Sequence, residues 1–394
     1  MEKTGKSSIL SVSFLITGNS VGSGLLALPI CIGLAGILPG LLVIVISCCF
    51  MTVTGLILAS VVNSKKRSDF DLPSIYGDLL GEWFKWIAVS ANLIVLYGLL
   101  VAYLSCLTTI IEATLGIHFL LLPLIVFLII TSVNFFAINI IKHSNTVFVI
   151  LLFISFITLV ILTGRNVNVE NFRHNNWTLI FISFPVLVNS FNFHNMVPIA
   201  CRLLNFDRKK SFTAIILGVL FSFLLNLIWC IAVVGVLKFN SGDTNSILYS
   251  YIHNLPATVP LARVVHSNLF NIVAILFATI AVVTSYWTVG AALTSFIKDL
   301  RCNYFPGVGN GISDLLVAFC PALIITLICS NIFISIQDII GGVGIAILFG
   351  ILPGYILFKK TGIGGKTFAG ILIIFFSFVF IFALLQQFGI LDLI

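Results

Sequence analysis

Long apolar runs alternate with short polar segments along the whole chain. Most of the runs reach or exceed the ~20 residues that a helix needs to cross the hydrocarbon core of a bilayer. They lack the alternating pattern that marks the strands of a membrane barrel. The pattern therefore predicts an all-α integral membrane protein of eleven transmembrane helices, at about 8–36, 39–63, 84–112, 119–141, 145–164, 177–201, 212–237, 268–297, 313–334, 337–358 and 367–390.

Two of these spans carry small and polar residues at mid-depth. Glycine weakens a helix interior. Lipid offers no water to freed backbone groups, so a break is tolerated only where protein or a wet cavity receives those groups. We expect one break in the first span, at Gly18, Asn19, Ser20, Gly22, Ser23 and Gly24, and a second in the sixth span, at Asn189, Ser190, Asn192, His194 and Asn195.

The two interrupted spans are five spans apart, and an odd offset gives them opposite orientations in the membrane. Paired breaks in two inverted halves are typical of a transporter with its site at the midplane. The amino end of a half-helix suits an anionic group, and freed carbonyls at a carboxyl end suit an ammonium group. An amino acid zwitterion offers both charges. A packing seam is the alternative, since Gly18 and Gly22 form one GxxxG match.

Five other side chains are candidates for the chemistry. His194 lies deep in a span, where an imidazole suits either proton movement or a neutral hydrogen bond that holds the broken helix in shape. Thr284 and Ser285 could bind a sodium ion or line a cavity, or could bond back to their own helix. Tyr97 and Tyr103, roughly two turns apart, could frame an aromatic substrate or simply pack. No acidic or basic side chain is clearly placed at the middle of a span.

Composition agrees with a membrane protein and sets its orientation. The chain has 394 residues, of which 60% are hydrophobic and 8% are charged, whereas soluble domains carry about 25% charged residues. Of the 20 lysines and arginines, 16 fall in segments on the same side of the membrane as the amino terminus, and 4 fall in segments on the opposite side. This bias predicts a cytoplasmic amino terminus and an outer carboxyl terminus. It also explains the net charge of +7 without a nucleic-acid partner.

Several classes of function find no support in the sequence. The nine cysteines form no CxxC pair and no cluster with metal-ligand spacing, so we expect neither a metal site nor a cofactor. No GxSxG, HExxH, P-loop or paired carboxylates point to an enzyme. A channel or a membrane scaffold without transport stays open as an alternative, although nothing resembles a filter sequence. The segment 238–267 is expected to hold a small surface helix.

Three short motifs coincide with the places chosen above. Residues 18–29 read GNSVGSGLLALP, residues 190–198 read SFNFHNMVP, and residues 284–286 read TSY. They resemble the motifs G-T-x-I-G-A-G-M-L-A-L-P, S-F-G-F-H-G-x-V-P and T-S-F of the hydroxy/aromatic amino acid permease family, within the amino acid–polyamine–organocation superfamily. The family includes bacterial tyrosine- and tryptophan-specific permeases. Asn19, Asn192 and Asn195 stand where that pattern has a threonine-like residue and two glycines.

The resemblance implies a fold of the leucine-transporter type, with inverted five-helix repeats at about 8–164 and 177–358 and an extra helix at about 367–390. It also implies import of an aromatic amino acid, tyrosine first, by proton symport across a bacterial inner membrane. A sodium-coupled permease for another neutral amino acid is the alternative. The expected substrate site comprises Gly18, Asn19, Ser20, Gly22, Ser23, Gly24, Tyr97, Tyr103, Asn189, Ser190, Phe191, Asn192, Phe193, Ser285 and Tyr286, and the candidate for proton coupling is His194.

Overall fold

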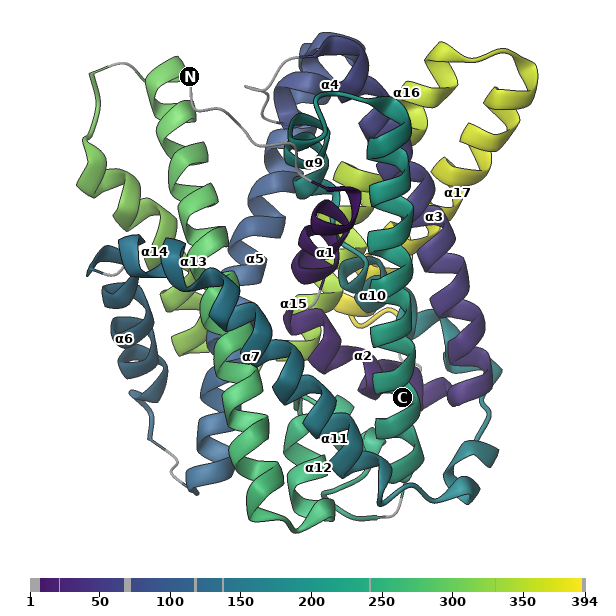
Figure 1. Ribbon diagram of the computed structural model, residues 1–394, viewed down its shortest axis with the longest axis vertical. Helices are drawn as coiled ribbons and strands as arrows, with labels where there is room; N and C mark the ends of the chain where they lie inside the picture. Colours follow the sequence, from purple (N-terminus) through teal and green to yellow (C-terminus); the bar gives the residue numbers. More distant parts are fainter. Residues whose placement is uncertain are drawn as a thin grey trace.

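Helices make up nearly the whole of the computed structural model (Figure 1). It describes residues 8–20, 22–66, 72–116, 119–136, 138–240, 242–305, 307–329 and 331–391, without the side chains of 115, 133–136, 138–147 and 149. No β-strand occurs in these ranges. The 3-10 helices η1–η3 and the π-helix η4 join the α-helices in the order α1 Ile9–Ser20, α2 Ser23–Ala35, α3 Ile37–Lys65, α4 Leu72–Leu80, α5 Glu82–Leu115, α6 Leu122–Phe136, α7 Ile138–Gly164, η1 Val169–Arg173, η2 Trp177–Ile182, α8 Ser183–Ser190, η3 His194–Met196, α9 Val197–Leu203, α10 Arg208–Val236, α11 Ile247–Ile252, α12 Thr258–Val265, α13 Asn268–Tyr304, α14 Gly311–Ile328, α15 Phe333–Ile339, η4 Ile340–Ile351, α16 Leu352–Lys360 and α17 Ile363–Gln387.

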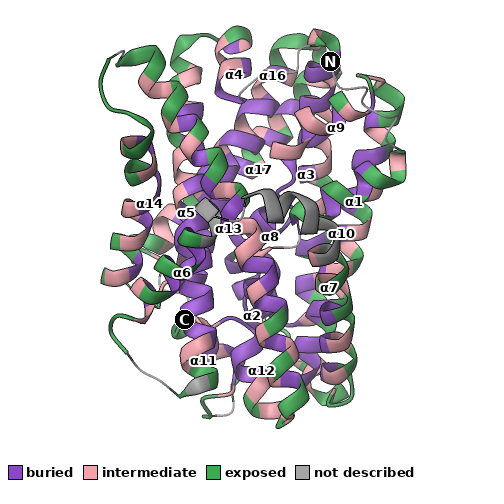
Figure 2. Ribbon diagram, turned by 60° about the vertical axis from the view of Figure 1, so that its left-hand side comes forward, coloured by how far each residue is buried: buried purple, intermediate pink, exposed green. Residues whose placement is uncertain are grey.

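Each of the eleven predicted spans contains an apolar helix. In the described part of the chain, eight helical segments are long and apolar enough to cross a membrane, and the bent pair α1 and α2 makes a ninth. The fourth and fifth spans correspond to the shorter apolar stretches Leu122–Ser132 and Ile150–Gly164. The outer helices expose apolar residues such as Leu220, Leu224 and Ile228 on α10. A surface of this kind suits lipid, and in Figure 2 the buried residues gather on the inner helices α2 and α8.

Both expected breaks are present. Helix α1 ends at Ser20, α2 begins at Ser23, and their axes differ by 62°. In the sixth span, α8 ends at Ser190 and η3 follows after three non-helical residues. Pro198 then lies in the first turn of α9, which suits a residue that lacks a backbone N–H. Val21, inside the first break, lies outside the described residues.

Close packing brings the two breaks together. A methyl group on Gly24 would lie 3.2 Å from the Cα of Ser190, so glycine is needed for this approach of α2 to α8. Helix α1 packs mainly on α10, and α2 packs on α8 and α10. The broken spans therefore form the centre of the molecule rather than its surface.

The loops differ from the prediction in three places. The segment 238–267 holds two helices, α11 and α12, and they fold inward: Ile247 and Leu261 are buried, and the Ala257 amide donates to the Leu26 carbonyl at 2.9 Å. Helix α4 was not predicted at all. The predicted ninth span ran six residues too far, because apolar residues resume at Ile332, directly after the short turn between α14 and α15.

Candidate functional site

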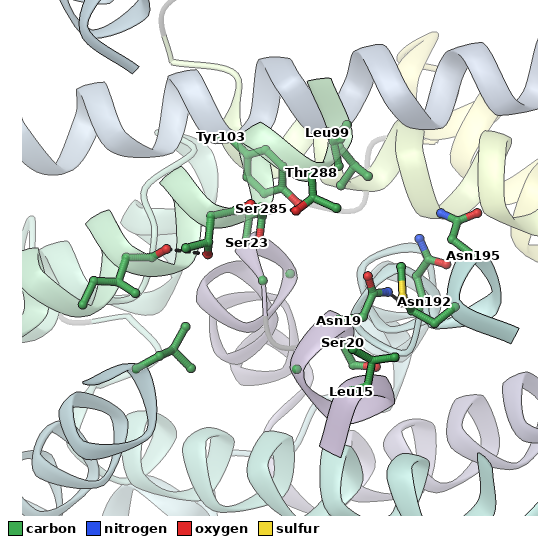
Figure 3. A pocket seen from close by; sticks show the side chains of 18 of the residues that line it. Leu15, Asn19, Ser20, Ser23, Leu99, Tyr103, Asn192, Asn195, Ser285 and Thr288 are labelled. Atoms are coloured by element: carbon green, nitrogen blue, oxygen red, sulfur yellow. Dashed lines mark hydrogen bonds between the residues drawn. The ribbon is translucent and has the colours of Figure 1, made fainter. Parts of the chain in front are cut away.

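A cavity of about 280 Å³ lies between the two broken spans. Its wall combines polar groups around the breaks with apolar side chains from α1, α5, α7 and α13 (Figure 3). The residues that line it are Phe14, Leu15, Gly18, Asn19, Ser20, Gly22, Ser23, Gly24, Leu99, Tyr103, Phe148, Leu152, Phe153, Asn189, Asn192, Asn195, Met196, Ile280, Thr284, Ser285, Thr288 and Val289.

The amino end of α2 forms one part of the wall. Gly22 occupies the N-cap position and offers no side chain to cap the helix. The Leu25 amide bonds to the Gly22 carbonyl at 3.1 Å, and the amides of Ser23 and Gly24 precede it in the first turn. Because the first amides of a helix lack partners within the helix, this end favours an anionic group.

The carboxyl end of α1 and the second break form another part of the wall. Asn19 Nδ2 donates to the Asn192 carbonyl at 3.0 Å, which ties the two breaks together. Asn192 Oδ1 is buried and has no hydrogen-bond partner among the described residues. In Figure 3, Asn19, Asn192 and Asn195 lie on one side of the cavity, and Ser23, Ser285 and Tyr103 lie on the other. The amide side thus offers an acceptor for a cationic group.

Gln337 of α15 joins the two half-helices behind this wall. Its Nε2 donates to Ser23 Oγ at 2.7 Å, and its Oε1 accepts from Asn189 Nδ2. Gln337 is fully buried. It was missing from the predicted site because it stands at the predicted start of the tenth span. A pair of polar residues, Gln337 and Asp338, at the head of an apolar run is the signal that would have found it.

Hydroxyl groups of α5 and α13 face the amino end of α2. Tyr103, Ser285 and Ser23 lie on the same side of the cavity, and all three residues line it (Figure 3). Thr284 also lines the cavity, but its Oγ1 donates to the Ile280 carbonyl of its own helix at 2.7 Å. That bond is the alternative that the sequence left open for a hydroxyl in a span. The described residues include no group of three or more histidines, cysteines and acidic residues that could hold a metal ion.

Ten of the fifteen residues predicted for the substrate site line the cavity, and five lie outside it. The Tyr97 hydroxyl donates to a carbonyl of α14 at 2.7 Å, and the Tyr286 hydroxyl bonds to Thr131 at 2.9 Å. Tyr97 was predicted from its residue type and Tyr286 from the motif at 284–286, while the direction of each side chain depends on its neighbours. The five that lie outside the cavity are Tyr97, Ser190, Phe191, Phe193 and Tyr286.

His194 is buried behind the second break rather than in the cavity wall. Its ring stacks between Phe193 and Phe349, with ring centroids 4.5 and 4.7 Å away. Its Nε2 lies 2.9 Å from Thr54 Oγ1, and that hydroxyl also lies 3.1 Å from the Met51 carbonyl. If the hydroxyl donates to the carbonyl, it accepts a hydrogen bond from Nε2. This arrangement favours the second role considered for His194, a neutral imidazole that holds the broken helix in shape.

The sequence placed no aspartate, glutamate, lysine or arginine clearly at the middle of a span, and the structure adds one buried carboxylate, that of Asp338. Asp338 is only 2% exposed. Helix α15 begins at Phe333, four residues before the predicted start of the tenth span, so Asp338 lies more than one turn inside the helix. The predicted span of 337–358 had placed Asp338 in the first turn, near the membrane surface.

Comparison with known proteins places the chain in a family. The sequence matches the tryptophan/tyrosine permease family over residues 5–386. The chain belongs to this family. Two of its relatives are the tyrosine-specific transport system 1 of Haemophilus influenzae, 23% identical over 82% of this chain and 81% of its own length, and the low affinity tryptophan permease of Escherichia coli, 24% identical over 92% and 91%.

Solved structures share the fold of this permease at low sequence identity. A crystal structure of MhsT in complex with L-phenylalanine has a TM-score of 0.62 at 14% identity, over 96% of this chain and 98% of that chain. A manganese transporter of Eremococcus coleocola reaches 0.58 at 12% identity, over 96% and 94%. The fold is thus the expected one of the leucine-transporter type, in a multi-pass membrane protein whose relatives are permeases rather than enzymes.

Proposed function

We propose that this permease imports an aromatic amino acid, tyrosine first, by proton symport. The observation that carries the proposal is the cavity between the two helix breaks, with a helix amino end on one side and, on the other, an amide oxygen that has no partner among the described residues. An amino acid needs both. The family adds the substrate class, since its relatives carry tyrosine- and tryptophan-transport names.

The cavity suggests how such a substrate would lie. The α-carboxylate would accept hydrogen bonds from the Ser23 and Gly24 amides at the amino end of α2. The ammonium group would donate to Asn192 Oδ1, the buried acceptor that has no partner among the described residues. The ring would extend along the apolar wall, where Leu152 and Phe153 lie. Pockets for small molecules commonly combine a few convergent polar groups with such an apolar lining.

The two halves of the first broken span differ in exposure. Phe14 and Leu15 of α1, on the amino-terminal side of the first break, are exposed at the cavity wall. Every residue of α2, on the other side, is buried. With the amino terminus proposed to lie in the cytoplasm of a bacterial inner membrane, this difference in exposure supports an inward-facing state. Alternation would come from rocking of one helix bundle against the other around the site.

Uptake into proteoliposomes tests the proposal. The purified full chain should accumulate radiolabelled tyrosine when an inwardly directed pH gradient is imposed, and an ionophore that collapses the gradient should abolish the accumulation. Replacement of sodium by choline should have no effect. Unlabelled tyrosine, tryptophan and phenylalanine should compete, and alanine should not.

Three results would contradict parts of this proposal separately. Uptake that does not change when the pH gradient is collapsed would refute proton coupling. Uptake that needs sodium would favour Thr284 and Ser285 as ion ligands. If none of the three aromatic amino acids competes, the proposal that the substrate is aromatic would be refuted. Current without saturation or counterflow would indicate a channel instead. A single-cysteine series with impermeant reagents would test the cytoplasmic amino terminus.

A further inference from the structure

Two carboxylates of the described chain are buried, and they differ in their partners. Asp314 at the start of α14 pairs with Arg301, whose Nε lies 2.7 Å from its Oδ1. Asp338 in α15 has no ion pair in the described part of the chain, and its Oδ1 is buried with no hydrogen-bond partner there. An intramembrane ionisable residue without a structural partner is a candidate for function.

The titratable neighbours of Asp338 are neutral groups. Cys31 of α2 and Tyr251 of α11 lie close enough to interact with it electrostatically. Helix α5 packs against the other face of α15, since Ile340 and Ile336 contact Gly98. These positions lie two residues from Asp338, or about 200° around a helix of 3.6 residues per turn. The ionisable residues of α5 therefore do not face Asp338.

The remaining helices around Asp338 add no cation. Helix α8 and the π-helix η4 contain no titratable residue. The only one in α17 is Lys366, in its first turn, whereas α17 approaches this region through Gln386 near its other end, which bonds to the Tyr251 hydroxyl. An ionised carboxylate in such surroundings is costly, because nothing replaces the water that it loses.

Asp338 lies in α15 between a residue that contacts the segment after α11 and a residue that contacts the cavity wall. One turn earlier in α15, the partly exposed Ser335 donates its amide and hydroxyl to Asn254 Oδ1, at 2.8 and 2.9 Å. The segment that follows α11 therefore covers the beginning of α15. On the other side, the adjacent Gln337 bonds to Ser23 in the cavity wall. The carboxyl group is thus one residue from the network that holds the amino end of α2.

We propose that Asp338 is the residue that binds the transported proton, and that the segment after α11 closes over the beginning of α15 only when Asp338 is protonated. The inference rests on the proposed symport and adds its proton site. When the outer side is open, a carboxylate oxygen takes a proton from outer water and an O–H bond forms. When the inner side is open, that bond breaks and the proton passes to inner water. The substrate moves in the same direction.

Asp338→Asn tests the proposal, because it keeps the size and the hydrogen-bonding capacity of the side chain but removes the titration. In proteoliposomes, this variant should lose concentrative uptake under a pH gradient and fall to the level of equilibration. It should retain counterflow, which needs no net proton movement. Its counterflow rate should also lose the pH dependence of the wild type. Asp338→Glu should restore part of the gradient-driven uptake.

Matched controls separate the possible outcomes. Asp243→Asn makes the same change in an exposed loop and should behave like the wild type. Gradient-driven accumulation by Asp338→Asn at the wild-type level would overturn the assignment. So would joint loss of counterflow and of thermal stabilisation by tyrosine, since that indicates a structural role. A wild type that shows counterflow but no response to pH would refute the symport itself.

Discussion

Gln337→Met removes the link between the two broken spans while nearly keeping the side-chain volume. Gln337 makes one hydrogen bond to Ser23 at 2.7 Å and one to Asn189. A buried hydrogen bond contributes about 1 kcal/mol net, so the two together contribute about 2 kcal/mol. Ser23 and Asn189 both line the cavity, so water can replace part of this loss. We therefore expect a net effect of about 1–2 kcal/mol.

This free energy should appear in substrate binding. The link holds the amino end of α2 beside α8, and a looser helix end presents its amides less precisely. A loss of 1–2 kcal/mol corresponds to a dissociation constant raised roughly 5- to 30-fold. Equilibrium binding of radiolabelled tyrosine to purified protein measures it. Gln387→Met is the matched control, because Gln387 is exposed and makes one long hydrogen bond of 3.4 Å.

A double-mutant cycle with Ser23→Ala decides whether the bond itself matters. Because both single changes break the same hydrogen bond, the double variant should bind almost as well as the weaker single variant. A coupling free energy of at least about 0.5 kcal/mol is expected. Strict additivity, or a dissociation constant for Gln337→Met within about twofold of the wild type, would refute the reasoning.

Three further predictions concern the site. Asn19→Ala removes the hydrogen bond between the breaks and should weaken tyrosine binding by about 1 kcal/mol; unchanged affinity would contradict it. Gly55→Ala places a methyl group 2.4 Å from a buried phenylalanine ring behind the second break, and should cost about 1–3 kcal/mol and lower the melting temperature in detergent. Gly370→Ala, which meets nothing within 4 Å, should not lower it. Tyr103→Phe should slow uptake severalfold because its hydroxyl faces the cavity, whereas Tyr97→Phe should leave uptake unchanged; equal effects would refute the assignment.

Sequence alone determined the features that depend on local interactions. The apolar runs predicted the spans because the bilayer requires about 20 apolar residues per crossing helix. The breaks at Gly22 and at Asn192 were predictable because glycine and clustered polar residues weaken a helix where they stand. Their offset of five spans also indicated that they belong together, and with the family motifs it placed ten residues at one cavity.

Tertiary structure decided which side chains reach the cavity and which do not. Tyr97 and Tyr103 are equally good candidates in the sequence. In the structure, the Tyr97 hydroxyl donates to a carbonyl of α14, whereas Tyr103 lines the cavity. Gln337 acts on residues about 150 and 314 positions away, and no local pattern contains such distances. Asp338 became a buried carboxylate because α15 packs against α5, α8 and α17, and because Asn254, more than 80 residues earlier in the chain, bonds to the first turn of α15. Helix formation is local, whereas burial and hydrogen-bond partners depend on how the helices pack.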